Sequence, residues 1–212
     1  MVESINRIFE YFPDLSAKQK SQFEQLGPIY RDLNKKINVI SRKDIDSLYV
    51  RHVLHSMAIA KFIQFKPDTE VVDLGTGGGF PGVPWAILFP EVRFLMIDGT
   101  AKKIRVVNEV VEHLGLDNGV GYHKRSEELR KKFDFVLARA VTRLDKLIPL
   151  ARPLISSQNK NAIPNGLITL KGGDLSAEIQ EVAKQNYIEH LPLTKYFSEE
   201  FFETKSIVYV QG

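Results

Sequence analysis

The chain has 212 residues, of which 43% are hydrophobic and 26% charged, close to the averages of soluble globular proteins. This composition excludes a wholly disordered chain, a collagen and a coiled coil, and no apolar run approaches the ~18 residues that suggest a membrane span. The 29 Lys and Arg against 26 Asp and Glu give a formal charge of +3, which permits a nucleic-acid partner only where the positive charge is locally clustered.

Two further absences bear on location. The sequence has no cysteine, so disulfides and thiolate catalysis are excluded and a reducing compartment is expected. Residues 1–12 show no basic stretch followed by an apolar one, so we expect no signal peptide and a cytoplasmic protein.

Residues 1–66 are predicted to form an N-terminal helical extension of three short helices. Helical spacing of apolar residues indicates the first over 5–12. Ser16, with Gln19 three residues later, forms a capping box that opens the second. The third is expected over 44–57. Because each helix has a single apolar stripe, we expect the three to pack on the rest of the chain rather than to fold alone.

Residues 67–212 are predicted to alternate strands and helices and to form the core domain. The expected strands are 71–74, 93–98, 120–123, 133–138, 167–171 and 207–210, and the expected helices are 85–89, 101–114, one capped by Thr142, and 174–184. This order predicts an α/β fold in which helices cover both faces of a parallel sheet.

The strongest functional signal is the run DLGTGGGFPG at residues 73–82, which follows the first predicted strand. Glycines let the backbone approach a ligand that any Cβ would keep away. Asp98 ends the next strand, where a carboxylate can hydrogen-bond ribose hydroxyls. Together these features predict an adenosine-type cofactor at the carboxyl ends of the strands.

Two cofactor classes fit this run. A GxGxxG pattern that begins at Gly77 matches the dinucleotide fingerprint. A GxGxG pattern that begins at Gly75, with Asp73 two residues earlier, is typical of S-adenosylmethionine methyltransferases. The dinucleotide interpretation would put Phe80 and Pro81 where a pyrophosphate is cradled, so we favour the methyltransferase interpretation. The alternative without a functional role is a glycine-rich turn that binds no ligand.

The run at 73–84 also resembles the RsmG family, formerly called glucose-inhibited division protein B, the bacterial 16S rRNA guanine-N7 methyltransferases. Weaker matches lie at 38–41, 51–56, 125–127, 138–140 and 171–172. The chain departs from the family pattern at Gly99 and Ala138, where the family has serine, and the C-terminal part matches poorly. The resemblance implies a Rossmann-like class I S-adenosylmethionine-dependent methyltransferase fold. It also implies methyl transfer to N7 of a guanine in the decoding-region loop of the small subunit.

The resemblance also assigns site residues. It implies that Gly75 and Phe80 contact S-adenosyl-L-methionine, that Ser126 and Glu127 lie near its adenine, and that Arg139 lies near the cofactor. With the motif itself, the predicted cofactor-binding residues are Asp73, Gly75, Thr76, Gly77, Gly79, Phe80, Asp98, Ser126, Glu127 and Arg139. We expect no metal.

Methylation of guanine N7 needs no general base, because this nitrogen carries a free lone pair and no proton. Catalysis is then mostly positioning, and the predicted substrate-positioning residues are Arg51, His52, Lys102, Arg139 and Lys171. Lys102 begins a helix, where a cation opposes the macrodipole, which favours a phosphate contact. Arg139 is suited to bind either the methionine carboxylate or an rRNA phosphate, and the sequence does not choose.

The expected partner is 16S rRNA within the small ribosomal subunit, and we expect a monomer with no membrane contact. Two other functions remain open at this point. One is a methyltransferase with another acceptor, such as a small molecule. The other is a dinucleotide-binding module without catalysis.

Overall fold

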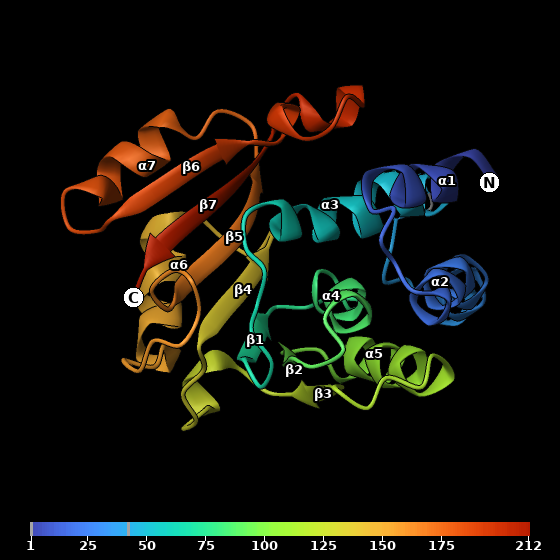
Figure 1. Cartoon of the computed structure of the whole chain (residues 1–212). Coiled ribbons are helices and arrows are strands. Elements are labelled where there is room, and N and C mark those ends of the chain that lie inside the picture. The colour runs from blue at the N-terminus through green and yellow to red at the C-terminus, as the bar shows by residue number, and fades with distance from the viewer. Residues whose placement is uncertain (1, 42) are drawn as a thin grey trace.

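A seven-stranded sheet organises the chain, which a computed structural model describes over residues 2–41 and 43–212 (Figure 1). The strand order is β3-β2-β1-β4-β5-β7-β6. The strands are β1 Glu70–Leu74, β2 Arg93–Asp98, β3 Gly119–His123, β4 Phe135–Arg139, β5 Gly166–Gly172, β6 Ile188–Pro192 and β7 Lys205–Gln211. Strands β1 to β5 pair in parallel, as the sequence predicted.

The predicted parallel order is wrong at one end of the sheet. Strand β7 lies between β5 and β6 and runs antiparallel to both. Two 3₁₀ turns, Leu193–Lys195 and Glu200–Phe202, connect β6 to β7 instead of a crossover helix, and such a connection suits antiparallel neighbours. The sequence analysis missed β6 because its residues are mostly half-buried and show no apolar alternation.

Helices cover both faces of the sheet (Figure 1). They are α1 Val2–Tyr11, α2 Ala17–Lys36, α3 His55–Met57, α4 Gly82–Leu88, α5 Ala101–His113, α6 Leu144–Ala151 and α7 Ser176–Ala183. Neighbouring residues of one strand enter different cores: Val71 packs with α2, α4 and α5, whereas Val72 packs with α6 and α7. This alternation follows from the period of two along a strand.

One edge of the sheet has a helix on one face only. Between β3 and β4 the chain forms only the 3₁₀ turn η4, Ser126–Glu128, instead of a helix. Val120 and Tyr122 of β3 remain 41% and 51% exposed, whereas Gly121 between them packs against Asn108 of α5. The sheet is therefore covered on one side only at this edge.

The third predicted helix, 44–57, is not one regular helix. It consists of a 3₁₀ turn η1 (Ile45–Ser47), a π-helical segment η2 (Tyr49–Leu54) and α3, and a 3₁₀ turn η3 (Ala58–Lys61) continues it. The Ser56 hydroxyl donates to the His52 carbonyl at 2.6 Å. Such a bond to the residue four positions earlier competes with regular helical pairing.

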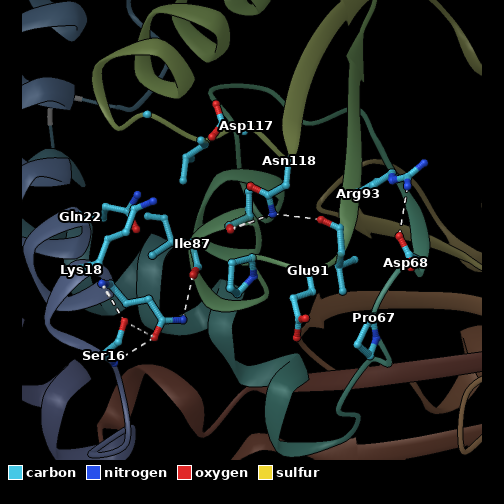
Figure 2. Close-up of a pocket in the computed structure, with 16 residues that line it drawn as sticks. Ser16, Lys18, Gln22, Pro67, Asp68, Ile87, Glu91, Arg93, Asp117 and Asn118 are labelled. Atoms are coloured by element: carbon cyan, nitrogen blue, oxygen red, sulfur yellow. Dashed lines mark hydrogen bonds and ion pairs between the residues drawn. The ribbon is translucent and has the colours of Figure 1, made fainter.

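Helix α2 is bonded to the ends of two core helices. The capping box predicted at Ser16 is confirmed in both of its hydrogen bonds. Gln19 also donates to the carbonyls of Ile87 and Leu88, and Gln22 donates to that of Leu114. A groove of about 720 Å³ runs between these elements (Figure 2).

The lining of this groove shows which edge of the sheet it occupies. Asp68 and Arg93 precede or begin strands β1 and β2, so the groove lies at the amino ends of the strands. Asn118 donates to three carbonyls there. The side-chain amide of Asn118 therefore binds the end of α4 and the turn that follows it.

Across the ranges 2–41 and 43–212, no helix combines the length and apolarity that a membrane crossing needs.

Candidate functional site

The glycine turn lies at the carboxyl end of β1. Gly77 and Gly79 have φ of +61° and +99°, a region that L side chains rarely adopt. A Cβ on Gly79 would lie 2.7 Å from Val83 Cγ2 and 2.9 Å from the Tyr30 hydroxyl. A Cβ on Gly77 would meet nothing closer than 4.0 Å. The backbone at Gly77 therefore borders open space that a side chain would fill, as a ligand cradle requires.

Asp73 supports this turn from within the protein. It is fully buried, and its Oδ2 accepts a hydrogen bond from the Gly82 amide at 2.9 Å. Among the described residues, its Oδ1 and the Thr76 hydroxyl have no hydrogen-bond partner. Burial raises the pKa of Asp73 to about 7, against the lowering effect of the neighbouring Thr76 hydroxyl and the Gly82 amide.

Asp98 holds the same turn from the neighbouring strand. Its Oδ2 accepts from the Gly77 amide at 3.1 Å and its Oδ1 accepts from the Thr100 amide at 2.8 Å. Lys103 Nζ lies 3.7 Å from Oδ2. A carboxylate has about four acceptor positions, so Asp98 retains capacity for the hydroxyls of a ribose.

Phe80 connects the turn to the N-terminal segment. Its buried ring lies 4.9 Å from the ring of Tyr30 and 5.3 Å from that of His52. The Tyr30 hydroxyl donates to the Gly78 carbonyl at 2.6 Å, and burial raises its pKa. The Arg139 guanidinium lies over the Phe80 ring at 5.3 Å, within the range of a cation–π interaction.

Arg139 ends β4 and is held by the segment η2. Its Nη1 donates to the Arg51 carbonyl at 3.2 Å and its Nη2 lies 2.9 Å from His52 Nδ1. The described residues give this guanidinium no carboxylate partner within ion-pair distance, and burial lowers its pKa to about 10. Because a guanidinium only donates, His52 Nδ1 is the acceptor and the ring proton lies on Nε2.

The charge state of His52 agrees with this arrangement. Burial first, and the Arg139 charge second, lower the pKa of His52 to about 4. His52 is therefore neutral at physiological pH and acts as a single N–H donor, while Arg139 carries the positive charge.

A second cavity adjoins this pair. It has a volume of about 310 Å³ and lies at the carboxyl ends of β4 and β5. It is lined by Asp44, Arg51, His52, His55, Arg139, Ala140, Leu170, Lys171, Gly172, Phe201 and Lys205. We call it the β4–β5 pocket. Four predicted positioning residues, Arg51, His52, Arg139 and Lys171, meet there.

Seven of the eleven lining residues were not predicted as site residues, among them Asp44, Phe201 and Lys205. Phe201 and Lys205 belong to the C-terminal part that matches the family pattern poorly, and no local pattern placed them beside β5. Asp44 precedes η1, and the sequence analysis used it only as the start of the helix expected over 44–57. Its position seven residues before Arg51 was the one available signal.

Lys171 is engaged within the protein. Its Nζ donates to the Thr142 carbonyl at 2.8 Å and forms an ion pair with the buried Glu178 of α7. Glu178 Oε1 also accepts the amide of Leu144, the first residue of α6, at 2.5 Å. The prediction that Thr142 caps this helix is therefore wrong, because the cap residue is Arg143 and the capping group comes from α7.

Three predicted residues lie at the edge of the site. Lys102 is exposed in the first turn of α5. Ser126 and Glu127 form η4 after β3, where the Ser126 hydroxyl donates to the Glu127 carboxylate at 3.0 Å. None of the three makes a hydrogen bond to the glycine turn in the described part of the chain. Their roles remain predictions.

Comparison with known sequences gives one consistent result. The family profile GidB, described as rRNA small subunit methyltransferase G, matches residues 19–201. A protein of Phocaeicola vulgatus named Ribosomal RNA small subunit methyltransferase G is 53% identical over 203 residues, which are 96% of each chain. A protein of the same name from Flavobacterium johnsoniae is 48% identical over 206 residues, which are 97% of each chain.

Comparison with solved structures supports the fold. A SAM-dependent methyltransferase from Aquifex aeolicus aligns over 81% of this chain and 98% of its own, with a TM-score of 0.56 and 15% identity. A chain of a fibrillarin/Nop5p complex aligns over 76% of this chain and 81% of its own, with a TM-score of 0.56 and 15% identity. At this identity the likeness shows a shared class I methyltransferase fold.

Proposed function

Because this chain belongs to the GidB family of rRNA small subunit methyltransferases, we propose that it transfers a methyl group from S-adenosylmethionine to N7 of a guanine in 16S rRNA. The main structural support for this proposal is one contact within the site. The Phe80–Arg139 contact joins the glycine cradle to the cation-lined β4–β5 pocket. A cofactor and a nucleotide acceptor thereby have adjacent places.

The residues present fit the cofactor. The open backbone at Gly77 provides a cradle, and Asp98 provides acceptors for ribose hydroxyls. Asp73 stabilises the turn from the protein interior, by accepting a hydrogen bond from the Gly82 amide, rather than by contact with the ligand. S-adenosylmethionine, when bound, supplies a methyl group already activated by its sulfonium.

The chain's own residues then act by positioning. N7 of guanine has a free lone pair, so no side chain has to remove a proton. His52 is a neutral donor, and Arg139 holds it in one tautomer. We propose that these two side chains orient the acceptor, because fixed donors keep reacting atoms within about 3–3.5 Å of each other.

Arg139 is also suited to bind an anion. Its cation is half-buried and lacks a carboxylate partner among the described residues. A buried charge without a counter-charge is unfavourable, which favours binding of a carboxylate or a phosphate beside it. We propose this role for Arg139, with the methionine carboxylate and the rRNA phosphate as its two candidates.

We further propose that the protein acts as a monomer on the small ribosomal subunit. The net charge of +3 is small for RNA binding by bulk attraction. RNA presented in a folded shape lets a few contacts suffice, and an assembled subunit presents it so.

Radiolabelled methyl-S-adenosylmethionine and small ribosomal subunits that lack the modification test the function. We expect label on N7 of one guanine with the wild type, and none with Gly75→Asp. Glu181→Ala serves as the control, since Glu181 lies exposed on α7. Calorimetric binding of S-adenosylhomocysteine without any label on the subunit would show a different acceptor.

A further inference from the structure

The β4–β5 pocket contains one side chain whose chemistry differs from the rest. We propose that this pocket receives the acceptor guanine, and that Asp44 selects guanine by accepting hydrogen bonds from its N1–H and 2-amino groups. This inference rests on the proposed function and names the residue that reads the acceptor base.

Asp44 is the only carboxylate among the described residues that line the pocket, whose other charged members are cations. Its Oδ1 accepts from Arg51 at 2.8 Å and its Oδ2 accepts from the Ser41 hydroxyl at 2.7 Å. The Ser41 bond first, and the Arg51 bond second, lower the pKa of Asp44. The group is therefore ionised at neutral pH and can only accept.

The two contacts leave about half of the acceptor positions of the Asp44 carboxylate free. A carboxylate has about four acceptor positions, and Ser41 and Arg51 occupy two of them. The side chain is 32% exposed, so its remaining positions are open to a ligand. Arg51 and Ser41 also fix the orientation of the carboxylate, which limits the entropy lost on binding.

Guanine presents the matching donors. Its N1–H and 2-amino group are neighbouring donors, whereas adenine has an acceptor at N1 and no 2-amino group. N7 lies across the ring system from these donors. A base bound to Asp44 by its Watson–Crick edge therefore keeps N7 free of Asp44. Enzymes that modify a base commonly read an extruded nucleotide by this edge.

Other residues of the pocket suit a nucleotide. Phe201 is half-buried, and its ring lies 5.8 Å from the Arg51 guanidinium and 4.8 Å from Lys205 Nζ. Aromatic rings and guanidinium planes are the surfaces on which proteins stack RNA bases, and cations at the rim bind phosphates. A cavity of about 310 Å³ is at the small end of ligand sites and suits one base.

The test compares Asp44→Asn with Asp46→Asn. Asp46 lies two residues away, is exposed and does not line the pocket. Each enzyme receives small subunits reconstituted with guanosine or with inosine at the target position, since inosine lacks only the 2-amino group. Initial rates of methyl transfer give the guanosine-to-inosine ratio. Calorimetry with S-adenosylhomocysteine checks the cofactor site.

We expect the wild type and Asp46→Asn to prefer guanosine by about 10- to 100-fold, because inosine leaves one acceptor of a charged group unpaired. Asp44→Asn should methylate guanosine more slowly and should lose most of this preference, with binding of S-adenosylhomocysteine unchanged. A merely structural defect would slow both substrates and keep the ratio.

Two results would overturn the inference, and they are distinguishable. An active wild type whose guanosine-to-inosine ratio is the same in Asp44→Asn would remove Asp44 from base recognition and leave the proposed function intact. A wild type that labels neither subunit would overturn the proposed function, and this inference with it.

Discussion

At the scale of single residues, Gly77 and Gly79 are glycines for different reasons. Both have positive φ, but only the Gly79 position is crowded, by Val83 and the Tyr30 hydroxyl. The position of Gly77 is strained for a side chain but open. The first is therefore required by packing, and we propose that the second is required by the ligand.

This difference predicts that Gly77→Ala mainly loses ligand binding, whereas Gly79→Ala mainly loses stability. Gly77→Ala should cost about 1–2 kcal/mol of stability, from its backbone alone, and should abolish binding of S-adenosylhomocysteine. Gly79→Ala should cost about 3 kcal/mol or more of stability, because the steric overlap of its Cβ with Val83 and Tyr30 adds to the backbone strain. Urea denaturation and calorimetry measure the two effects. Full binding by Gly77→Ala would contradict a cradle at that position.

Asp73 makes stability depend on pH. Its pKa is about 7 in the folded protein, because of burial, against 3.8 for the free side chain. The folded state therefore binds the proton more tightly, and the free energy of unfolding falls as pH rises between about 4 and 7. The loss is roughly 4 kcal/mol at most, at 1.36 kcal/mol per pH unit.

Replacement of Asp73 by asparagine should remove this dependence. Relative to Asp73→Asn, the ligand-free wild type should be most stable near pH 4 and should lose its advantage by pH 8. Urea denaturation at a series of pH values measures the difference, with Asp46→Asn as the control for an exposed carboxylate. A constant difference between the curves would mean that Asp73 does not titrate in this range.

At the scale of elements, helix α6 depends on a residue of α7. Glu178 accepts the first amide of α6 and pairs with Lys171 of β5, so one buried carboxylate joins three elements. Lys171 in turn holds the Thr142 carbonyl. The adjoining loop contains Ala140 at a φ of +54°, a strained position directly after Arg139.

Loss of this carboxylate should be costly. Glu178→Ala should destabilise the protein by about 3–5 kcal/mol, because it leaves Lys171 buried and unpaired. Glu178→Gln should cost less, since its amide oxygen still accepts from Leu144. Glu181→Ala, on the same helix but exposed, should change stability by less than about 1 kcal/mol. Equal unfolding midpoints in urea for Glu178→Ala and Glu181→Ala would refute the capping role.

At the scale of the whole molecule, the N-terminal helices share a core with the sheet. One hydrophobic cluster contains Phe23 and Leu54 together with Phe94 and Phe135 of the strands. The buried Trp85 donates its indole N–H to the Ser56 carbonyl at 2.7 Å. The division at residue 67 remains a prediction, and these contacts indicate that the two parts depend on each other.

Removal of residues 1–66 should therefore prevent folding of the remainder. Residues 67–212 alone should show no cooperative thermal transition by circular dichroism, because α4 and β2 would expose their apolar faces. The whole chain should unfold in one transition, with Trp85 fluorescence and circular dichroism coincident. A fragment that melts cooperatively and binds S-adenosylhomocysteine would show an independent domain.

Much of this protein was predictable from local patterns in its sequence. The Ser16 capping box, the positions of the first five strands along the chain and the glycine turn after Asp73 all depend on residues a few positions apart. Local backbone preferences and hydrogen bonds act over that range. These features, with the motif at 73–84, were sufficient for the fold class and the family.

The tertiary structure decided the rest. It placed β7 antiparallel to β5, joined the first amide of α6 to Glu178, and brought Asp44 and Phe201 into the lining of one pocket. These pairings join residues far apart in the chain. Their formation depends on closing long loops and on burial summed over the whole core. No short stretch of sequence contains that balance, so the glycine turn was predictable from local sequence, whereas the lining of the β4–β5 pocket was predictable only in part.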